Sequence, residues 1–324
     1  MTTNMNNIEL QIKNALKNNY EITYNTLPVS TTILENLKNE FNDSKFTLSE
    51  TQDYISKLNT NKSTLTTITL HNIVINVLTK SKHDNIPYLL LHRVIKRLFI
   101  VSTIFNINKK FVYWLIPTNN NKWFPKKSVI MPKHINGGFT YITNTDTVNI
   151  YIYRREEFPK VMIHELMHHS YLDTSYLSNT HEYKDTLDKL KHICNISKDT
   201  LFLPNEGIIE AWALILQSLF ISYEYNIPFK LIIDIEKKWS IKQTSRILYH
   251  KYHNLNNIWK EDTNSYCYIV LKTFLINNVT NFIYHSLNKT IYNYYIENIE
   301  NFILQIKPKN IKHDSFRMSV YGNM

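Results

Sequence analysis

Apolar residues recur at three- and four-residue spacing through the first part of the chain, which is typical of amphipathic helices. This spacing predicts helices over residues 8–18, 31–41 and 48–58, and a longer apolar helix over 87–107. Residues 65–78 are ambiguous, because their Thr and Ile content suits a strand whereas their length suits a helix. We therefore expect a helical N-terminal region covering residues 1–108.

The pattern then changes to strand-like runs over residues 111–116, 128–131, 138–143 and 148–153. The last run alternates, so that Val148, Ile150 and Ile152 share one face and Asn149, Tyr151 and Tyr153 share the other. We expect these strands to form one small, mainly antiparallel sheet, with 148–153 at its edge.

Helical spacing returns after the sheet, beginning with a helix from Pro159 to about Tyr171. Further helices are predicted over residues 186–193, 206–223, 229–239, 241–252, 266–276 and 291–306. The expected fold is α+β, with a core over residues 109–225 and a helical C-terminal subdomain over 226–324.

The composition excludes several classes of protein. Hydrophobic residues make up 43% of the 324 residues, which is too many for a disordered chain. Only 4 Gly and 2 Cys are present, which excludes collagen-like and disulfide-scaffold proteins. The polar N-terminus lacks a signal-peptide core, and charged residues interrupt the most apolar stretch, 89–105. These features predict a soluble, intracellular protein without a membrane span.

The chain is basic, with a formal net charge of +10. Lysines greatly outnumber arginines and are scattered, unlike the clustered basic stripe of a nucleic-acid reader. The abundance of Asn, Ile and Lys fits an AT-rich genome, such as that of a large DNA virus or a protozoan parasite. The charge alone therefore does not predict a nucleic-acid partner.

The segment His164-Glu165-Leu166-Met167-His168 contains the pattern HExxH. On a helix, His164 and His168 lie one turn apart on the same face and can bind one metal ion. Zinc suits two imidazoles, a carboxylate and a water. Glu165 is then the expected general base, which takes a proton from that water and passes it to the leaving amine.

A second segment, Leu203-Pro-Asn-Glu-Gly-Ile-Ile-Glu-Ala-Trp-Ala213, supplies the remaining acids. With the HExxH helix it resembles the gluzincin metallopeptidases, in which a later helix opens with Asn-Glu. The resemblance covers residues 137–212 and implies a zincin-like core, with Glu206 as the third zinc ligand. It also implies that Glu210, one turn later, supports a ligating histidine.

The chain departs from the family pattern in two ways. Between His168 and Glu206 lie 37 residues, about twice the spacing of the aminopeptidase and thermolysin branches. The excess, near residues 179–198, is interpreted as an inserted charged helix. In addition, no Gly-Ala-Met-Glu-Asn type of sequence precedes the motif, so aminopeptidase specificity does not transfer.

The few small residues cluster near these motifs: Gly137, Gly138, Gly207, Ala211 and Ala213. We expect Gly207 and Ala211 to allow close approach of the Glu206 helix to the zinc helix, and the glycine pair to form a bend or bulge beside a substrate strand.

Other candidates stay open at this point. Gluzincins place a downstream Tyr or His at the oxyanion, and Tyr266, Tyr268, Tyr284 and His285 are possible here. His169 points about 100° away from His168 on the helix, so it is not an expected ligand. His181 and His192 belong to the insertion and are expected to be exposed.

Together these features predict a zinc-dependent metallopeptidase that acts on a peptide or protein substrate. Narrow carboxypeptidase-like or protein-processing activity is one alternative within this class. The alternative from another class is a basic structural or nucleic-acid-associated protein with a non-catalytic zinc site. The sequence does not define the bond that is cut, an activating partner or the oligomeric state.

Overall fold

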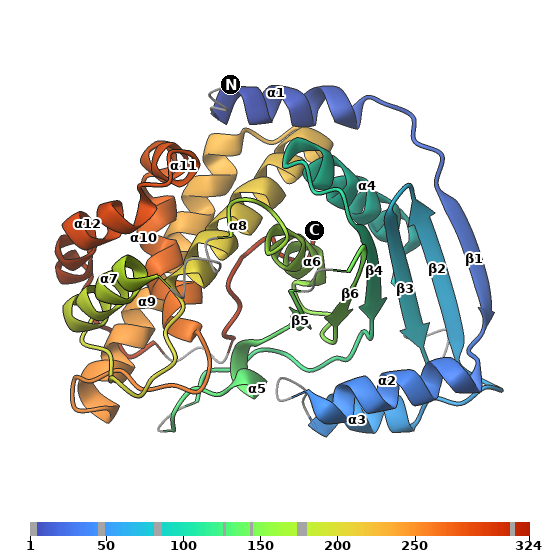
Figure 1. The fold of residues 1–324 in the computed structure, drawn as a ribbon, viewed down its shortest axis with the longest axis horizontal. Helices are drawn as coiled ribbons and strands as arrows, with labels where there is room; N and C mark the ends of the chain where they lie inside the picture. Colours follow the sequence, from blue (N-terminus) through green and yellow to red (C-terminus); the bar gives the residue numbers. More distant parts are fainter. Residues whose placement is uncertain are drawn as a thin grey trace.

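The structure is a computed structural model, which describes residues 5–44, 49–80, 86–125, 128–142, 145–173, 180–311 and 315–324. Parts of three sequence predictions, at Leu48, Thr143 and Asn179, lie outside the described residues. The described part of the chain is a mixed α+β protein in which one sheet packs against helices (Figure 1).

Six strands of the described residues form one sheet in the order β1-β2-β3-β4-β6-β5. β1–β2, β2–β3 and β5–β6 pair antiparallel, whereas β3–β4 and β4–β6 pair parallel. The sheet is therefore mixed, and our expectation of a mainly antiparallel sheet was wrong at its centre. The strands are β1 (Thr23–Pro28), β2 (Thr64–Leu70), β3 (Ile73–Thr79), β4 (Lys110–Leu115), β5 (Gly138–Thr140) and β6 (Thr147–Ile152).

The expectation that residues 1–108 are helical was also incomplete. The helices α1 (Met5–Leu16), α2 (Thr31–Asp43), α3 (Ser49–Ser56) and α4 (Tyr88–Ile104) lie close to their predicted ranges. The ambiguous stretch 65–78 is a hairpin, β2–β3, that turns at His71 with φ 50°. β1 was missed because all six of its residues are exposed, so no apolar alternation marks it.

One predicted strand is absent, and another lies elsewhere in the sheet. Residues 128–131 form no strand; Ile130 makes an isolated bridge to Glu261, and Pro132 then opens the short helix α5 (Pro132–Ile135). β6 is not an edge strand, because it lies between β4 and β5. The edge of the sheet on this side is the short strand β5.

The two faces of the sheet are covered by different helices. Val148, Ile150 and Ile152 of β6 belong to the larger core, which also takes in α4, α6 (Phe158–Met167) and α8 (Pro204–Tyr225). Tyr151 and Tyr153 belong to a second core with α2 and α3 on the opposite face. The predicted alternation of β6 is thus confirmed, and α6 is held between the sheet and α8 (Figure 1).

The later part of the described chain is helical. α7 (His181–Ile193), α8 and α9 (Phe229–Asn254) are followed by a π-helix over Cys267–Leu271, α10 (Lys272–Asn277), α11 (Val279–Leu287) and α12 (Ile291–Gln305). The two helices predicted over 229–252 are one continuous helix, and α11 was not predicted. None of the described helices combines the length and the apolar character needed to cross a bilayer. Both cysteines are buried and free.

Gly207 allows α8 to pack closely against another helix, although this helix is not the one that we expected. A Cβ atom there would lie 2.9 Å from Leu271 Cβ and 3.0 Å from the carbonyl oxygen of Cys267. The glycine therefore lets α8 approach the π-helix, rather than α6. At Gly138 a Cβ atom would lie 2.8 Å from the carbonyl oxygen of Tyr151, so this glycine allows tight packing of β5 on β6.

Candidate metal centre

α6 presents the HExxH residues at the bottom of a cleft. The helix begins after Glu157, with Pro159 in its first turn, and its apolar residues are buried between the sheet and α8. It ends at Met167, earlier than predicted, and His168 is its C-terminal cap residue with helical dihedral angles (φ −60°, ψ −19°). His164 and His168 therefore keep the one-turn spacing, and the centroids of their rings lie 4.9 Å apart.

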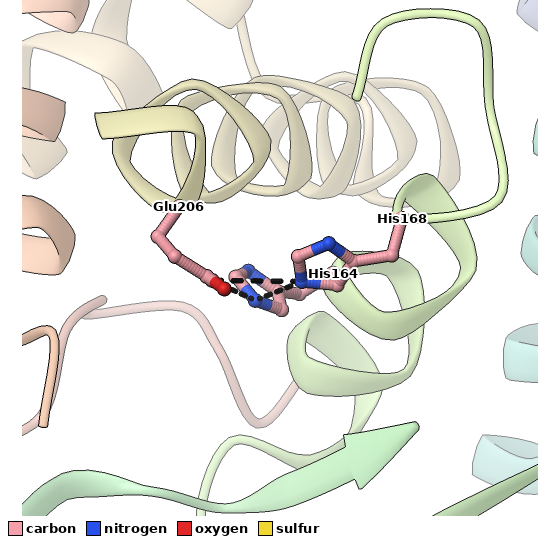
Figure 2. Close-up of side chains that lie close together, drawn as sticks. All are labelled: His164, His168 and Glu206. Carbon is pink, nitrogen blue, oxygen red and sulfur yellow. Dashed lines mark hydrogen bonds and ion pairs between the residues drawn. The ribbon is translucent and has the colours of Figure 1, made fainter. Parts of the chain in front are cut away.

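α8 brings Glu206 to the same point from its first turn (Figure 2). Glu206 Oε2 lies 3.4 Å from His164 Nε2 and 3.5 Å from His168 Nε2, and the two Nε2 atoms lie 3.2 Å apart. His164, His168 and Glu206 form the one group of this kind found among the described residues that can hold a metal ion. The structure thus brings together the three side chains that the sequence indicated.

Each imidazole has its own carboxylate on the far side. His164 Nδ1 lies 3.0 Å from Glu210 Oε2, and His168 Nδ1 lies 2.8 Å from Asp173 Oδ2. Asn205 Nδ2 in turn donates to Asp173 Oδ1 at 3.2 Å. Such carboxylates fix the tautomer of a ligating histidine, with the proton on Nδ1 and the lone pair on Nε2.

Asp173 was missed by sequence reasoning. It lies in the turn after α6, five residues beyond His168, and no spacing rule for a helix face selects it. The available signal was its position as the first acid after the HExxH motif. Glu210 was identified from the resemblance to gluzincins, which implies an acid one helical turn after Glu206 in support of a ligating histidine.

Electrostatics at the centre favour a cation. Burial would lower the pKa of His168, but the Glu206 and Asp173 carboxylates together raise it well above its ordinary value. Burial would likewise raise the pKa of Glu206, but the two imidazoles lower it. His168 Nδ1 is hydrogen-bonded to Asp173 and His164 Nδ1 lies 3.0 Å from Glu210 Oε2, and the two Nε2 atoms converge with one carboxylate oxygen of Glu206. A metal ion satisfies all three atoms at once.

A buried ion pair lies behind the carboxylate that faces His164. Lys160, one turn before His164, pairs with Glu210 Oε1, while Glu210 Oε2 faces His164. Both partners of the pair are almost inaccessible to solvent, at 0% and 1% of their side-chain surface. Since an unpaired charge is costly at such a depth, Lys160 holds the Glu210 carboxylate in place.

Glu165 faces the cleft beside the centre. Its side chain is buried, and its carboxylate accepts no hydrogen bond from the described part of the chain. Burial raises the pKa of this carboxyl. The cleft has a volume of about 580 Å³, and its walls come from β5, α6, the residues before α8 and the segment 262–268.

The structure separates the four oxyanion candidates. Tyr268, on the π-helix, lines the cleft, and its ring centroid lies 5.8 Å from that of His164. Tyr266 is fully buried in the core, and Tyr284 is 62% exposed on α11. His285, also on α11, stacks on Tyr294. Only Tyr268 of the four lines the described cleft.

The remaining histidines lie outside the centre, and the inserted segment has a role that we did not expect. His169 faces Thr140 and Phe111, and burial, with nearby cations, lowers its pKa to about 4. His181 and His192 on α7 are exposed, as predicted. However, Tyr183 of the same helix lines the cleft, so the segment that we interpreted as an insertion contributes to its wall.

Comparisons with known proteins identify no relative. No family model, curated protein or solved structure matches the chain.

Proposed function

We propose that the chain is a zinc-dependent metallopeptidase with a zincin-like core. The observation that carries the proposal is the triangle of His164 Nε2, His168 Nε2 and Glu206 Oε2, with sides of 3.2, 3.4 and 3.5 Å. Zinc bonds of about 2.0–2.1 Å in a tetrahedron place neighbouring ligand atoms about 3.3–3.4 Å apart. Three protein ligands leave the fourth position for water or substrate, as in catalytic zinc sites.

The residues around the centre supply the rest of the hydrolytic machinery. When bound, zinc would lower the pKa of water towards neutrality and polarise the substrate carbonyl. Glu165 takes the proton of the attacking water and later gives it to the leaving amine. Its buried position and raised pKa favour its carrying a proton between these two steps.

Tyr268 is the residue best placed to stabilise the oxyanion. Burial, together with the Glu206 and Glu165 carboxylates, raises the pKa of Tyr268 well above 10. The phenol therefore stays protonated at neutral pH and donates a hydrogen bond to the negative oxygen that develops on the substrate.

The substrate strand is expected to pair with β5. Gly138, Phe139 and Thr140 of this edge strand line the cleft, so an extended peptide bound in the cleft would run alongside β5 and next to Glu165. This assignment replaces the expectation that β6 receives the substrate.

The test of the proposal is cleavage of a mixed peptide pool with the products read by mass spectrometry. Protein purified with zinc should cleave peptide bonds, a chelator should abolish cleavage, and added zinc should restore it. Zinc binding without any cleavage would instead support the alternative of a non-catalytic zinc site.

Lys160→Met should weaken zinc binding by about 10–100-fold, because Glu210 loses the cation that fixes it against His164. The unpaired Glu210 should also cost about 3–5 kcal/mol of stability, measured by denaturant unfolding of zinc-free protein. Lys122→Met is the matched control, since Lys122 and Glu157 form an equally buried pair, 2.6 Å apart, that contacts no proposed ligand. Equal zinc affinity in the two variants would contradict the role of Lys160.

A further inference from the structure

The cleft has a charge opposite to that of the chain. The protein carries 37 Lys and Arg residues against 27 Asp and Glu, yet no lysine or arginine is found among the described residues that line the cleft. Its acids are Glu165, Asp173, Glu206 and Asp262. The first three have roles at the metal centre, whereas Asp262 has none there.

Asp262 is held on a fixed loop at the cleft. Its backbone N–H donates to the carbonyl oxygen of Ile130 at 2.9 Å, and Thr263 Oγ1 donates to Asn136 Oδ1 at 3.0 Å. Just before it, the buried Glu261 carboxylate accepts the N–H groups of Ser265 and Tyr266 at 2.6 and 3.0 Å. Asp262 is exposed, and its carboxylate forms no ion pair or hydrogen bond with the described part of the chain.

Asn264 provides a second, independent observation on the same wall. It lines the cleft with only 9% of its surface exposed, and its side-chain oxygen has no hydrogen-bond partner among the described residues. A buried acceptor without a donor is costly. A ligand that brings N–H donors into this part of the cleft would remove that cost.

We propose that the Asp262–Asn264 wall binds an alkylammonium or guanidinium group of the substrate, so that the cleft selects peptides carrying a positive charge. This inference rests on the proposed function in one respect, because it assumes that the peptide substrate binds in this cleft. The charged group has two possible sources, a Lys or Arg side chain and the N-terminal amine of the peptide. An acidic substrate, by contrast, finds no cationic side chain on the described walls of the cleft.

The experiment measures binding separately from cleavage. Zinc-loaded Glu165→Gln protein is immobilised, and the peptides that it retains are identified by mass spectrometry from two synthetic pools. One pool is N-acetylated and contains Lys and Arg at random positions among neutral residues. The other pool has free N-termini and contains no Lys or Arg. Enrichment of the cationic members of the first pool over its neutral members identifies the side chain as the source. Enrichment of the second pool over those same neutral, N-acetylated peptides identifies the N-terminal amine.

Cationic peptides should be enriched about fivefold over neutral ones, the size expected for one partly exposed charge pair. Adding Asp262→Asn should erase this enrichment, whereas adding Asp188→Asn should not. Asp188 is an exposed acid on α7 that does not line the cleft, so this control changes the net charge equally.

Retention without cationic enrichment, enrichment that survives Asp262→Asn, or no retention at all would each overturn the inference. The proposed peptidase function is tested separately, by asking whether the wild-type protein cleaves mixed peptides and whether a chelator abolishes that cleavage. A peptidase without a cationic preference would therefore refute this inference alone.

Discussion

Glu165→Gln is expected to lower peptide hydrolysis by about 10²–10⁴-fold while the protein keeps its fold and its zinc. Gln has nearly the same shape as Glu, but its amide cannot take a proton from the attacking water. Glu165 lies in the cleft and is not one of the three converging ligand residues. The measurement is the cleavage rate of a peptide that the wild-type protein cuts, together with metal analysis of both proteins.

The matched control is Glu182→Gln on α7, an exposed substitution of the same kind outside the cleft, which should leave the rate unchanged. Loss of zinc from Glu165→Gln would mean that Glu165 is a ligand. Retained hydrolysis would remove it from the mechanism.

Glu206→Ala should yield protein that is nearly free of metal, because it removes one of three ligands. Glu206 Oε2 lies 3.4 and 3.5 Å from the two Nε2 atoms, whereas Glu210 Oε2 lies behind His164, 3.0 Å from Nδ1. Glu210→Gln should therefore keep zinc, but with an affinity lower by about 10–100-fold. Gln is chosen here because it retains an oxygen that can accept the His164 proton.

Competition with a calibrated chelator ranks these two variants. Asp173→Asn makes a parallel change behind His168, 2.8 Å from Nδ1, and should behave like Glu210→Gln. If Glu210→Gln lost its metal while Glu206→Ala kept it, the third ligand would be Glu210 and the register of the gluzincin comparison would be broken.

The parts of the site that follow from helix geometry could be predicted from the sequence. His164 and His168 are four residues apart and therefore share one face of α6, whereas Glu206 and Glu210 of α8 were indicated by the resemblance to gluzincins. Asp173 could not be found in this way, because a turn and the amide of Asn205 bring it to His168. The sequence offered Tyr268 only as one of four candidates for stabilising the oxyanion, because the position of its side chain depends on how the π-helix packs.

The sheet was harder to predict than the helices. The central pairings β3–β4 and β4–β6 are parallel, and each joins strands that are separated by long connections. No local pattern encodes such a pairing, because it depends on how the intervening segments cross the sheet. The hairpin β2–β3 turns at His71 without a glycine, so the usual turn signal was missing as well.

The most direct measurement for the proposed zinc centre is the metal content of the folded wild-type protein. The protein is expressed in zinc-supplemented medium, purified without chelator and analysed by inductively coupled plasma mass spectrometry. About one zinc per chain is expected for a site with three protein ligands. Folded protein without zinc under these conditions would contradict the assignment of His164, His168 and Glu206.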